Sequence, residues 1–292
     1  MKTLLITGAT GYIGSHFIQK YSDFYKITPV SLRFQKVADI DFLNIDTVLH
    51  LSAFVHKQKS LQPKDYFHIN TEQSIALATS AKANGVKHFI FFSTVAVYGR
   101  NGDLDHKSSV VINEQSECAP IEPYGESKLM AEKHIAALED ENFMVSIIRP
   151  PIVYGHNCPG NMASLMRLVK LSPVLPFKYS ENQRSMVFID NLLHFTQLVI
   201  EKKVNGITIP QDMETLSIQE IVKALAKGIK KQVFLCKLPD PIFRYLCDRK
   251  SKVMSSLYGT LVFDSTLSNT RLGFTAPYST EEGLLLMCHP IN

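Results

Sequence analysis

The segment EPYGESKLMAEKH, residues 122–134, places Tyr124 and Lys128 four positions apart where a helix is predicted to begin. Residues at this spacing lie above one another on one face of a helix. A positive charge beside a phenol favours the phenolate, so the lysine is expected to lower the pKa of the tyrosine. Such a pair is suited to acid–base catalysis. The alternative is a surface helix start that carries a lysine, because this spacing also arises by chance.

A turn with three glycines near the N-terminus is suited to binding a phosphate group. It lies between an apolar run at 3–7, which predicts a buried strand, and a helical pattern at 12–21. Glycine lets the backbone approach a pyrophosphate, and the helix N-terminus stabilises the negative charge. The spacing is GxxGxxG and not GxGxxG, so a turn that only needs a positive φ is the alternative. The positions predicted to bind a dinucleotide here are Gly8, Gly11, Tyr12, Ile13 and Gly14.

The elements that must position these residues follow from the hydrophobic pattern. Apolar runs predict further strands, and helical patterns lie between them. This alternation indicates an α/β fold with a Rossmann-type, doubly wound parallel sheet covered on both faces. Only about fourteen residues separate the second and third strands, so that connection is expected to lack a full helix. The predicted strands are 26–32, 47–52, 88–93 and 144–150, and the helices are 65–83 and 124–140.

After residue 150 the composition changes, because segments 150–161 and 170–183 are rich in Pro, Gly and Asn and predict loops. Residues 1–150 are therefore predicted to form the dinucleotide-binding domain, with 186–203 packing back on it. A smaller C-terminal substrate-binding lobe is expected from 151–185 and 204–292. Helices are predicted near 161–170, 191–203, 217–230 and 241–256, and a short strand at 206–210.

Composition excludes several classes of function. The net charge of +4 over 292 residues and the lack of a basic block give no nucleic-acid footprint. Five scattered cysteines without a CxxC pair suggest reduced thiols, and lone histidines such as His50 and His56 predict no metal site. No apolar run approaches the ~20 residues of a membrane span or forms a signal segment, so a soluble, cytoplasmic protein is expected.

Five motifs occur in one order along the chain: TGATGYIG, HLSA, FSTVAVYG, PYGESK and RPPIVYG. Together they resemble the extended short-chain dehydrogenase/reductases of the NAD-dependent epimerase/dehydratase type, which act on nucleotide sugars. The resemblance continues through 182–192 and 257–274, so it covers nearly the whole chain. It implies a nucleotide-sugar substrate, and it makes a homodimer an option by analogy alone.

The resemblance implies that Thr94, Tyr124 and Lys128 form the catalytic set. Tyr124 would exchange the proton of a sugar hydroxyl, and Thr94 would orient the same oxygen. Lys128 would also hold the nicotinamide ribose. The HLSA motif adds Leu51, Ser52 and Ala53 to the positions implied for the cofactor.

Two polar residues in the second half are candidates for the diphosphate of the substrate. Arg184 lies in a segment that resembles the family's phosphate-binding arginine, and a guanidinium suits bidentate phosphate contacts. Asn161 starts a predicted helix and could reach phosphate, although Asn is also a common N-cap. The basic tract 248–252 is interpreted mainly as a solvated face.

The end of the second strand indicates which dinucleotide is preferred. An acid about 20 residues past the glycines would bind the ribose 2′-hydroxyl of NAD. Ser31 and Arg33 occupy that place instead, while Asp39 and Asp41 lie further along and could contact adenine or ribose. A guanidinium without a competing carboxylate favours a 2′-phosphate. We therefore expect NADP(H), with NAD(H) as the alternative.

The motifs narrow the reaction but leave alternatives open. Val95 and Ala96 follow Thr94 where dehydratases of the family carry an acidic pair, so loss of water is not expected. Ile152 replaces an Asn that many relatives carry three residues after the residue matching Arg149. Arg33 and Ile152 together favour an NADPH-dependent UDP-4-keto-6-deoxy-N-acetylhexosamine 4-reductase. The pattern most resembles a branch of the family linked to surface-polysaccharide sugars, which implies a role in surface polysaccharide biosynthesis. The alternatives are a UDP-sugar 4-epimerase and a catalytically silent dinucleotide-binding sensor or scaffold.

Overall fold

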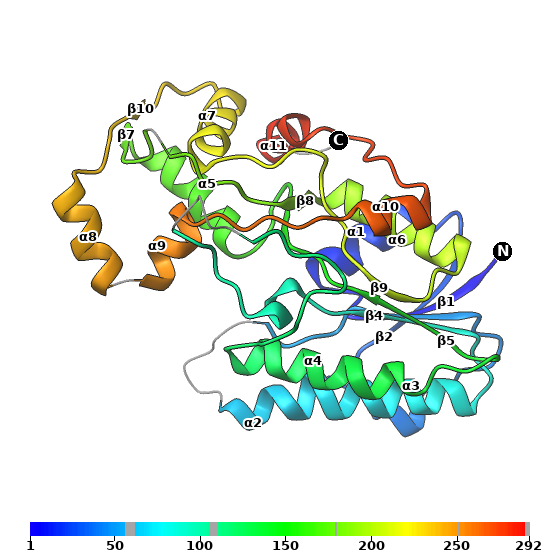
Figure 1. Cartoon of the computed structure of the whole chain (residues 1–292). Helices are drawn as coiled ribbons and strands as arrows, with labels where there is room; N and C mark the ends of the chain where they lie inside the picture. Colours follow the sequence, from blue (N-terminus) through cyan, green and yellow to red (C-terminus); the bar gives the residue numbers. More distant parts are fainter. Residues whose placement is uncertain (56–61, 105–109, 179, 250, 290–292) are drawn as a thin grey trace.

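A parallel sheet of six strands, five from the first half of the chain and one from residues 206–208, forms the centre of the first domain (Figure 1). The computed structural model describes residues 1–55, 62–104, 110–178, 180–249 and 251–289. The strands lie in the order β2-β1-β3-β4-β5-β9, with every neighbouring pair parallel. The predicted doubly wound fold is confirmed. The strand bounds are β1 Thr3–Thr7, β2 Lys26–Val30, β3 Thr47–His50, β4 His88–Phe92, β5 Met144–Ile148 and β9 Gly206–Thr208.

Helices cover both faces of the sheet, as Figure 1 shows. Because side chains of a strand alternate between faces, Leu4 and Ile6 join the core beneath helices α1 and α6, and Leu5 joins the core beneath α3 and α4. All three side chains are fully buried. The helix bounds are α1 Tyr12–Tyr21, α6 Ile189–Lys202, α3 Gln73–Ala83 and α4 Pro123–Ala136.

The connection between β2 and β3 is abbreviated as predicted. It contains one 3₁₀ turn, η1 (Val37–Asp39), and no α-helix. The chain therefore crosses from the edge strand β2 past β1 to β3. This crossing leaves the carboxyl ends of β1 and β3 adjacent at a switch point of the sheet, where ligands of α/β proteins bind.

The region predicted as one helix at 65–83 is a helix with a π-helical turn inside it. Helix α2 (Pro63–Tyr66) passes into the π turn η2 (Phe67–Glu72), which continues as α3. A π turn inserts an extra residue into the helix and often occurs at functional sites. Here it places the buried side chain of Asn70 against α4.

One part of the predicted domain division is wrong. Residues 206–210 were assigned to the C-terminal lobe, but β9 pairs with β5 and completes the sheet of the first domain. The short apolar segment could not be placed by pattern alone. Helix α6 does pack on α1, and Lys20 and Asp190 form an ion pair of 2.6 Å between these helices.

The remaining elements form the C-terminal lobe above and beside the sheet (Figure 1). Two short parallel pairs, β6 with β8 and β7 with β10, were not predicted, and β6 and β7 lie in segments expected to be loops. The helix predicted at 241–256 is two helices. The part of the chain that the structure describes contains no helix long and apolar enough to cross a membrane. The bounds are β6 Ile152–Tyr154, α5 Asn161–Leu171, β7 Val174–Leu175, β8 Met186–Phe188, α7 Ile218–Gly228, β10 Phe234–Leu235, α8 Asp240–Arg249, α9 Ser251–Tyr258, α10 Thr266–Leu272 and α11 Thr280–Met287.

Candidate functional site

Thr94 and Tyr124 meet where a strand ends and a helix begins. Thr94 follows β4 and caps the 3₁₀ turn η3 (Val95–Tyr98), accepting a hydrogen bond of 3.1 Å from the Ala96 N–H. Tyr124 is the second residue of α4, whose first residue is a proline, a preferred start for a helix. Thr94 and Tyr124 line the same cavity, and the Thr94 hydroxyl acts to lower the Tyr124 pKa. The two residues predicted to share one substrate oxygen thus face one cavity.

The expected lowering of the Tyr124 pKa by Lys128 is wrong for the cofactor-free protein. Burial raises the Tyr124 pKa to about 12, and only the bond to Thr94 opposes this shift. The Nζ of Lys128 instead lies over the ring of Phe91 and has no hydrogen-bond partner among the described residues. Burial lowers the Lys128 pKa to about 7, and the charge of Glu132 acts in the opposite direction. The buried lysine therefore has donors free for a ligand.

Asn70, which the sequence motifs did not single out, holds the helix that carries the pair. Its side chain accepts from the Phe54 N–H at 2.7 Å and donates to the Ser127 hydroxyl at 3.1 Å. Thr71 donates to the Ser127 carbonyl at 2.8 Å. These bonds tie the loop after β3 to the first turns of α4. Its sequence signal is weak, because Asn70 lies between Ile69 and Thr71 in a segment predicted as a helix.

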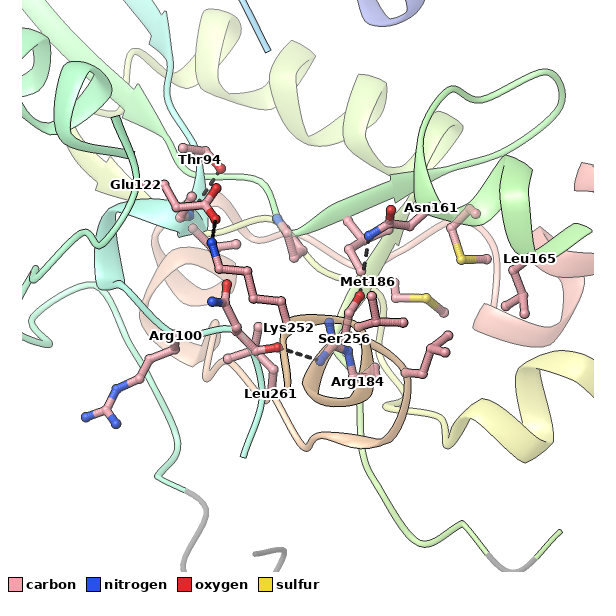
Figure 2. Close-up of a pocket in the computed structure, with 18 of the residues that line it drawn as sticks. Thr94, Arg100, Glu122, Asn161, Leu165, Arg184, Met186, Lys252, Ser256 and Leu261 are labelled. Carbon is pink, nitrogen blue, oxygen red and sulfur yellow. Dashed lines mark hydrogen bonds and ion pairs between the residues drawn. The ribbon is translucent and has the colours of Figure 1, made fainter. Parts of the chain in front are cut away.

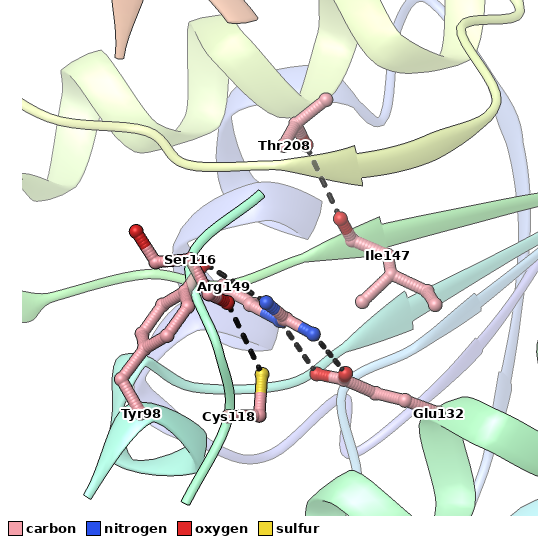
Figure 3. A network of polar contacts seen from close by, with 7 residues as sticks. All are labelled: Tyr98, Ser116, Cys118, Glu132, Ile147, Arg149 and Thr208. Atoms are coloured by element: carbon pink, nitrogen blue, oxygen red, sulfur yellow. Dashed lines mark hydrogen bonds and ion pairs between the residues drawn. The ribbon is translucent and has the colours of Figure 1, made fainter. Parts of the chain in front are cut away.

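A buried ion pair fixes the other end of α4 to the sheet (Figure 3). Arg149 follows β5 and donates to both carboxylate oxygens of Glu132, at 3.0 and 2.5 Å. It also donates to the Tyr98 hydroxyl at 2.8 Å. The side chains of both charged residues are only 3% exposed. Because Glu132 is one turn beyond Lys128, this pair sets the position of α4 relative to β4 and β5.

A cavity of about 860 Å³ extends from Thr94 and Tyr124 to the C-terminal lobe. Figure 2 shows Thr94 on one side and Asn161, Ser256 and Arg184 gathered on the other. The wall between them is largely apolar and includes Ile152. The cavity thus joins Thr94 and Tyr124 to a polar end.

Arg184 is a buried cation at that polar end. Its Nη1 donates to the Gly259 carbonyl at 3.1 Å and to the carbonyls of Asn101 and Ser255 at 3.4 Å. Burial lowers its pKa to about 10. No carboxylate forms an ion pair with Arg184 in the part of the chain that the structure describes. A buried guanidinium without a counter-ion is suited to binding an anionic ligand.

Two further polar groups border the cavity. Gly160, with φ of 79°, caps α5, so Asn161 is the first helical residue and not the cap. The amide of Asn161 donates to the Ser256 hydroxyl at 3.4 Å. Lys252 forms an ion pair of 2.7 Å with Glu122, which precedes α4. One residue of the basic tract 248–252 therefore borders the cavity, while Lys250 lies outside the described residues.

The glycine turn between β1 and α1 forms a backbone cradle. Gly8 has φ of 72°, and a Cβ there would lie 2.8 Å from the Ser52 nitrogen. A Cβ on Gly14 would overlap the Gly8 carbonyl, so both positions require glycine. No side chain caps α1, which leaves its first N–H groups available to a phosphate. The Leu51 N–H bonds the Thr7 carbonyl at 3.2 Å, which keeps the end of β3 beside the cradle.

These features fit a nicotinamide dinucleotide. The cradle accepts a pyrophosphate, and the unpartnered Nζ of Lys128 can donate to ribose hydroxyls. Ser31 and Arg33 are exposed after β2, as is Asp39 in η1. His50 lies between the hydroxyls of Thr7 and Ser74, and burial lowers its pKa to about 3, which is consistent with packing. His56, the other histidine considered above for a metal site, lies outside the described residues.

Comparison with known proteins extends over the whole fold. The sequence model of the NAD dependent epimerase/dehydratase family matches residues 4–210. A UDP-glucose 4-epimerase of Vibrio cholerae is 34% identical, covering 97% of this chain and 93% of its own. An Escherichia coli O157:H7 protein, N-acetyl-alpha-D-glucosaminyl-diphospho-ditrans,octacis-undecaprenol 4-epimerase, is 25% identical over 96% of this chain and 92% of its own. The fold is shared with UDP-glucuronic acid 4-epimerase from Bacillus cereus in complex with NAD, at a TM-score of 0.76 and 22% identity over 98% and 97% of the chains. The chain therefore belongs to the NAD dependent epimerase/dehydratase family of enzymes.

Proposed function

We propose that the chain exchanges an alcohol and a ketone at C4 of a UDP-linked sugar. The observation that carries this proposal is the placement of Thr94 and Tyr124 in the lining of one cavity, with the buried Lys128, unpartnered among the described residues, one turn along α4. The bound nicotinamide supplies the acceptor and donor of hydride. The residues of the chain supply the proton transfer and the geometry.

The proton balance assigns a role to each residue. When the C4 hydroxyl is oxidised, its proton passes to Tyr124 as the C4 hydrogen leaves with its electron pair. Reduction returns both. Thr94 would position the sugar oxygen through its hydroxyl, which lines the same cavity as Tyr124. Lys128 would bind ribose and, as a cation held nearby, make the phenolate more accessible than it is in the cofactor-free protein.

Arg184 and Asn161 would bind the diphosphate at the other side of the cavity. The separation of Arg184 from Tyr124 within one cavity suits a sugar diphosphate that spans the site. UDP is the proposed carrier because the Vibrio cholerae relative is named for a UDP-sugar. The Escherichia coli relative is named for a sugar on undecaprenyl diphosphate, which presents the same diphosphate group to a cation.

The first candidate reaction is 4-epimerisation. The Vibrio cholerae and Escherichia coli relatives, which each match nearly the whole chain, are named 4-epimerases. An epimerase oxidises C4 and then reduces the opposite face, so it consumes no cofactor overall.

The second candidate is the 4-ketosugar reductase expected from the sequence, with a UDP-4-keto-6-deoxy-N-acetylhexosamine as substrate and NADPH as cofactor. Two observations favour it. Arg33 follows β2, where an acid would select NAD. Ile152 faces the cavity where many relatives of this family present an Asn, so one polar anchor for the sugar is missing.

One assay separates the candidates. Purified protein is incubated with UDP-glucose, UDP-N-acetylglucosamine and a UDP-4-keto-6-deoxy sugar, while NADPH absorbance and the product sugar are followed together. Interconversion of C4 epimers without net NADPH loss supports the epimerase. Stoichiometric NADPH oxidation with the ketosugar supports the reductase. Binding of the dinucleotide without turnover on any of these sugars would leave the silent sensor or scaffold as the reading.

A further inference from the structure

Positive charge is concentrated in two segments of the C-terminal lobe. Residues 161–178 and 227–252 together carry eleven Lys and Arg against two Asp. The rest of the chain is net negative, because the whole chain has 31 basic and 27 acidic residues. The two segments are separated in sequence, so neither forms an obvious basic block. The fold brings them together, since β7 of the first segment pairs with β10 of the second.

The same segments carry exposed apolar and aromatic side chains. Leu171, at the end of α5, is 71% exposed and Phe234, in β10, is 70% exposed. In α8, Ile242 and Tyr245 are 49% and 59% exposed. Val174 in β7 is also half exposed. Exposed apolar groups gathered in one region mark an interaction surface.

Helix α8 has an inner and an outer face. Its inner face packs through Phe243, whose ring meets the Tyr258 ring at a centroid distance of 5.4 Å. Its outer face carries Ile242, Tyr245 and Arg249 at helical spacing, and no described residue of α8 is buried. Figure 1 shows α8 with β7 and β10 at one end of the molecule, away from the sheet. We call the outer face of α8, the β7–β10 pair and the end of α5 the basic face.

Two cations of the basic face have no acidic partner among the described residues. Of the neighbouring cations, Lys237 pairs with Asp240, and Lys231 donates to three backbone carbonyls. In contrast, no carboxylate lies within ion-pair distance of Lys170 or Arg244 in the described part of the chain. Arg249 lies over the Tyr245 ring at 5.6 Å. The face therefore keeps a positive potential next to its apolar groups.

We propose that the basic face docks the protein on the surface of an anionic lipid bilayer. Apolar and aromatic side chains with interspersed Lys and Arg are the chemistry of peripheral membrane binding: the apolar groups enter the headgroup region and the cations pair with anionic lipids. A nucleic acid would use the cations but not Leu171, Phe234 and Ile242. The proposal does not depend on which C4 reaction the enzyme performs.

The basic face also adjoins the substrate cavity. Helix α9 follows α8 and lines the cavity with Lys252, Val253 and Ser256. Docking through α8 would therefore bring the polar end of the cavity, with Arg184, towards the lipid headgroups. This position would give the site access to a diphosphate presented at a membrane as well as to one in solution.

The absence of tryptophan from the chain allows a direct test. The single reporters Ile242→Trp and Phe24→Trp are compared, because Phe24 is 62% exposed and follows α1, outside the basic face. Vesicles of phosphatidylglycerol and phosphatidylethanolamine are added, with phosphatidylcholine vesicles as the neutral control. We expect the emission of the Trp at 242 to shift to shorter wavelength with anionic vesicles only, and that of the Trp at 24 to stay unchanged.

Flotation with the same vesicles measures the contribution of charge. Arg244→Gln and Arg249→Gln are each expected to weaken binding about fivefold, the effect of one cation near an anionic surface. Raised salt should weaken binding further. Equal flotation with neutral vesicles, or no emission shift at 242, would overturn the proposal. A protein dimer that Tyr245→Ser dissociates would also overturn the proposal, as would tighter binding to duplex DNA than to the vesicles.

Discussion

The Nζ of Lys128, in α4, lies 3.8 Å from the centre of the Phe91 ring, in β4. Among the described residues this aromatic face takes the place of the polar partners that a buried ammonium requires. Such a contact compensates only part of the desolvation, and burial lowers the Lys128 pKa to about 7. Lys128 is therefore positioned to bind a ligand, and its burial lowers the free energy of unfolding when no ligand is bound.

This penalty predicts how stability of the cofactor-free protein depends on pH. The Lys128 pKa is about 7 when folded and 10.5 in its ordinary state, so the unfolded chain binds an extra proton between these values. The free energy of unfolding therefore rises with pH across this window because of this group. The free energy of unfolding of wild type minus that of Lys128→Met, both measured with urea, should increase from pH 7 to pH 10. A constant difference would contradict the burial of a titrating lysine.

Tyr124→Phe is expected to lower turnover by at least ~10²-fold, the scale of general acid–base catalysis, because only the proton-exchanging hydroxyl is removed. Cofactor binding and the unfolding midpoint should change little. Tyr25→Phe is the matched control: it removes a hydroxyl that donates to Glu201 at 2.6 Å, far from the cavity. In that variant the free energy of unfolding should fall by about 1 kcal/mol, while turnover should be unchanged. Similar turnover in both variants would exclude Tyr124 from the reaction.

Removing one partner of the buried pair at the end of α4 should be strongly destabilising. Glu132→Gln leaves the Arg149 guanidinium buried without a counter-charge, which costs about 3 to 5 kcal/mol. The double variant Glu132→Leu with Arg149→Met removes both charges and should be more stable than Glu132→Gln. Urea unfolding of the single and double variants measures this coupling. A loss below about 1 kcal/mol for Glu132→Gln would mean that the pair does not anchor the helix.

Arg33 predicts a preference for a 2′-phosphate on the cofactor. Arg33→Ala should weaken NADPH binding about tenfold, the effect of about 1.5 kcal/mol for hydrogen bonds to a charged group, and leave NADH binding unchanged. Lys36→Ala is the control, since Lys36 is equally exposed three residues further along. Calorimetric titration with both dinucleotides tests the prediction. Tighter binding of NADH by wild type, or equal losses in both variants, would assign Arg33 no role in cofactor choice.

The sequence predicted those features that depend on short-range pattern. Apolar runs located five strands of the sheet, and the glycine turn follows from a motif with local geometry. The placement of Thr94 and Tyr124 at one cavity joins residues 30 positions apart, and it was implied by the family resemblance. The three-residue strand β9 was misplaced because its pairing with β5 is a long-range choice that its own residues do not encode.

The electrostatics of the site were harder to predict for a similar reason. The spacing of Tyr124 and Lys128 suggested that the lysine acts on the phenol, but burial by surrounding elements dominates both pKa values. The Glu132–Arg149 pair joins residues 17 positions apart through the packing of α4 on β5. Nothing in either local segment indicates that the other carries the opposite charge.

Arg184 offers the sharpest test of how the substrate is held. Its Nη1 is fixed by backbone carbonyls, and no carboxylate pairs with it among the described residues, so the guanidinium is preorganised for an anionic group. Arg184→Met should raise KM for a UDP-sugar at least ~tenfold with a smaller change in kcat, because a diphosphate is bound alike in the ground and transition states. Arg184→Lys should recover part of the loss, since it keeps the charge without the planar fork. Arg100→Met is the control, because Arg100 is exposed at the edge of the same cavity and points away from Arg184 in Figure 2. Equal KM values for the Arg184→Met and Arg100→Met variants would show that only the general positive potential attracts the substrate, and that the buried guanidinium does not contact its diphosphate.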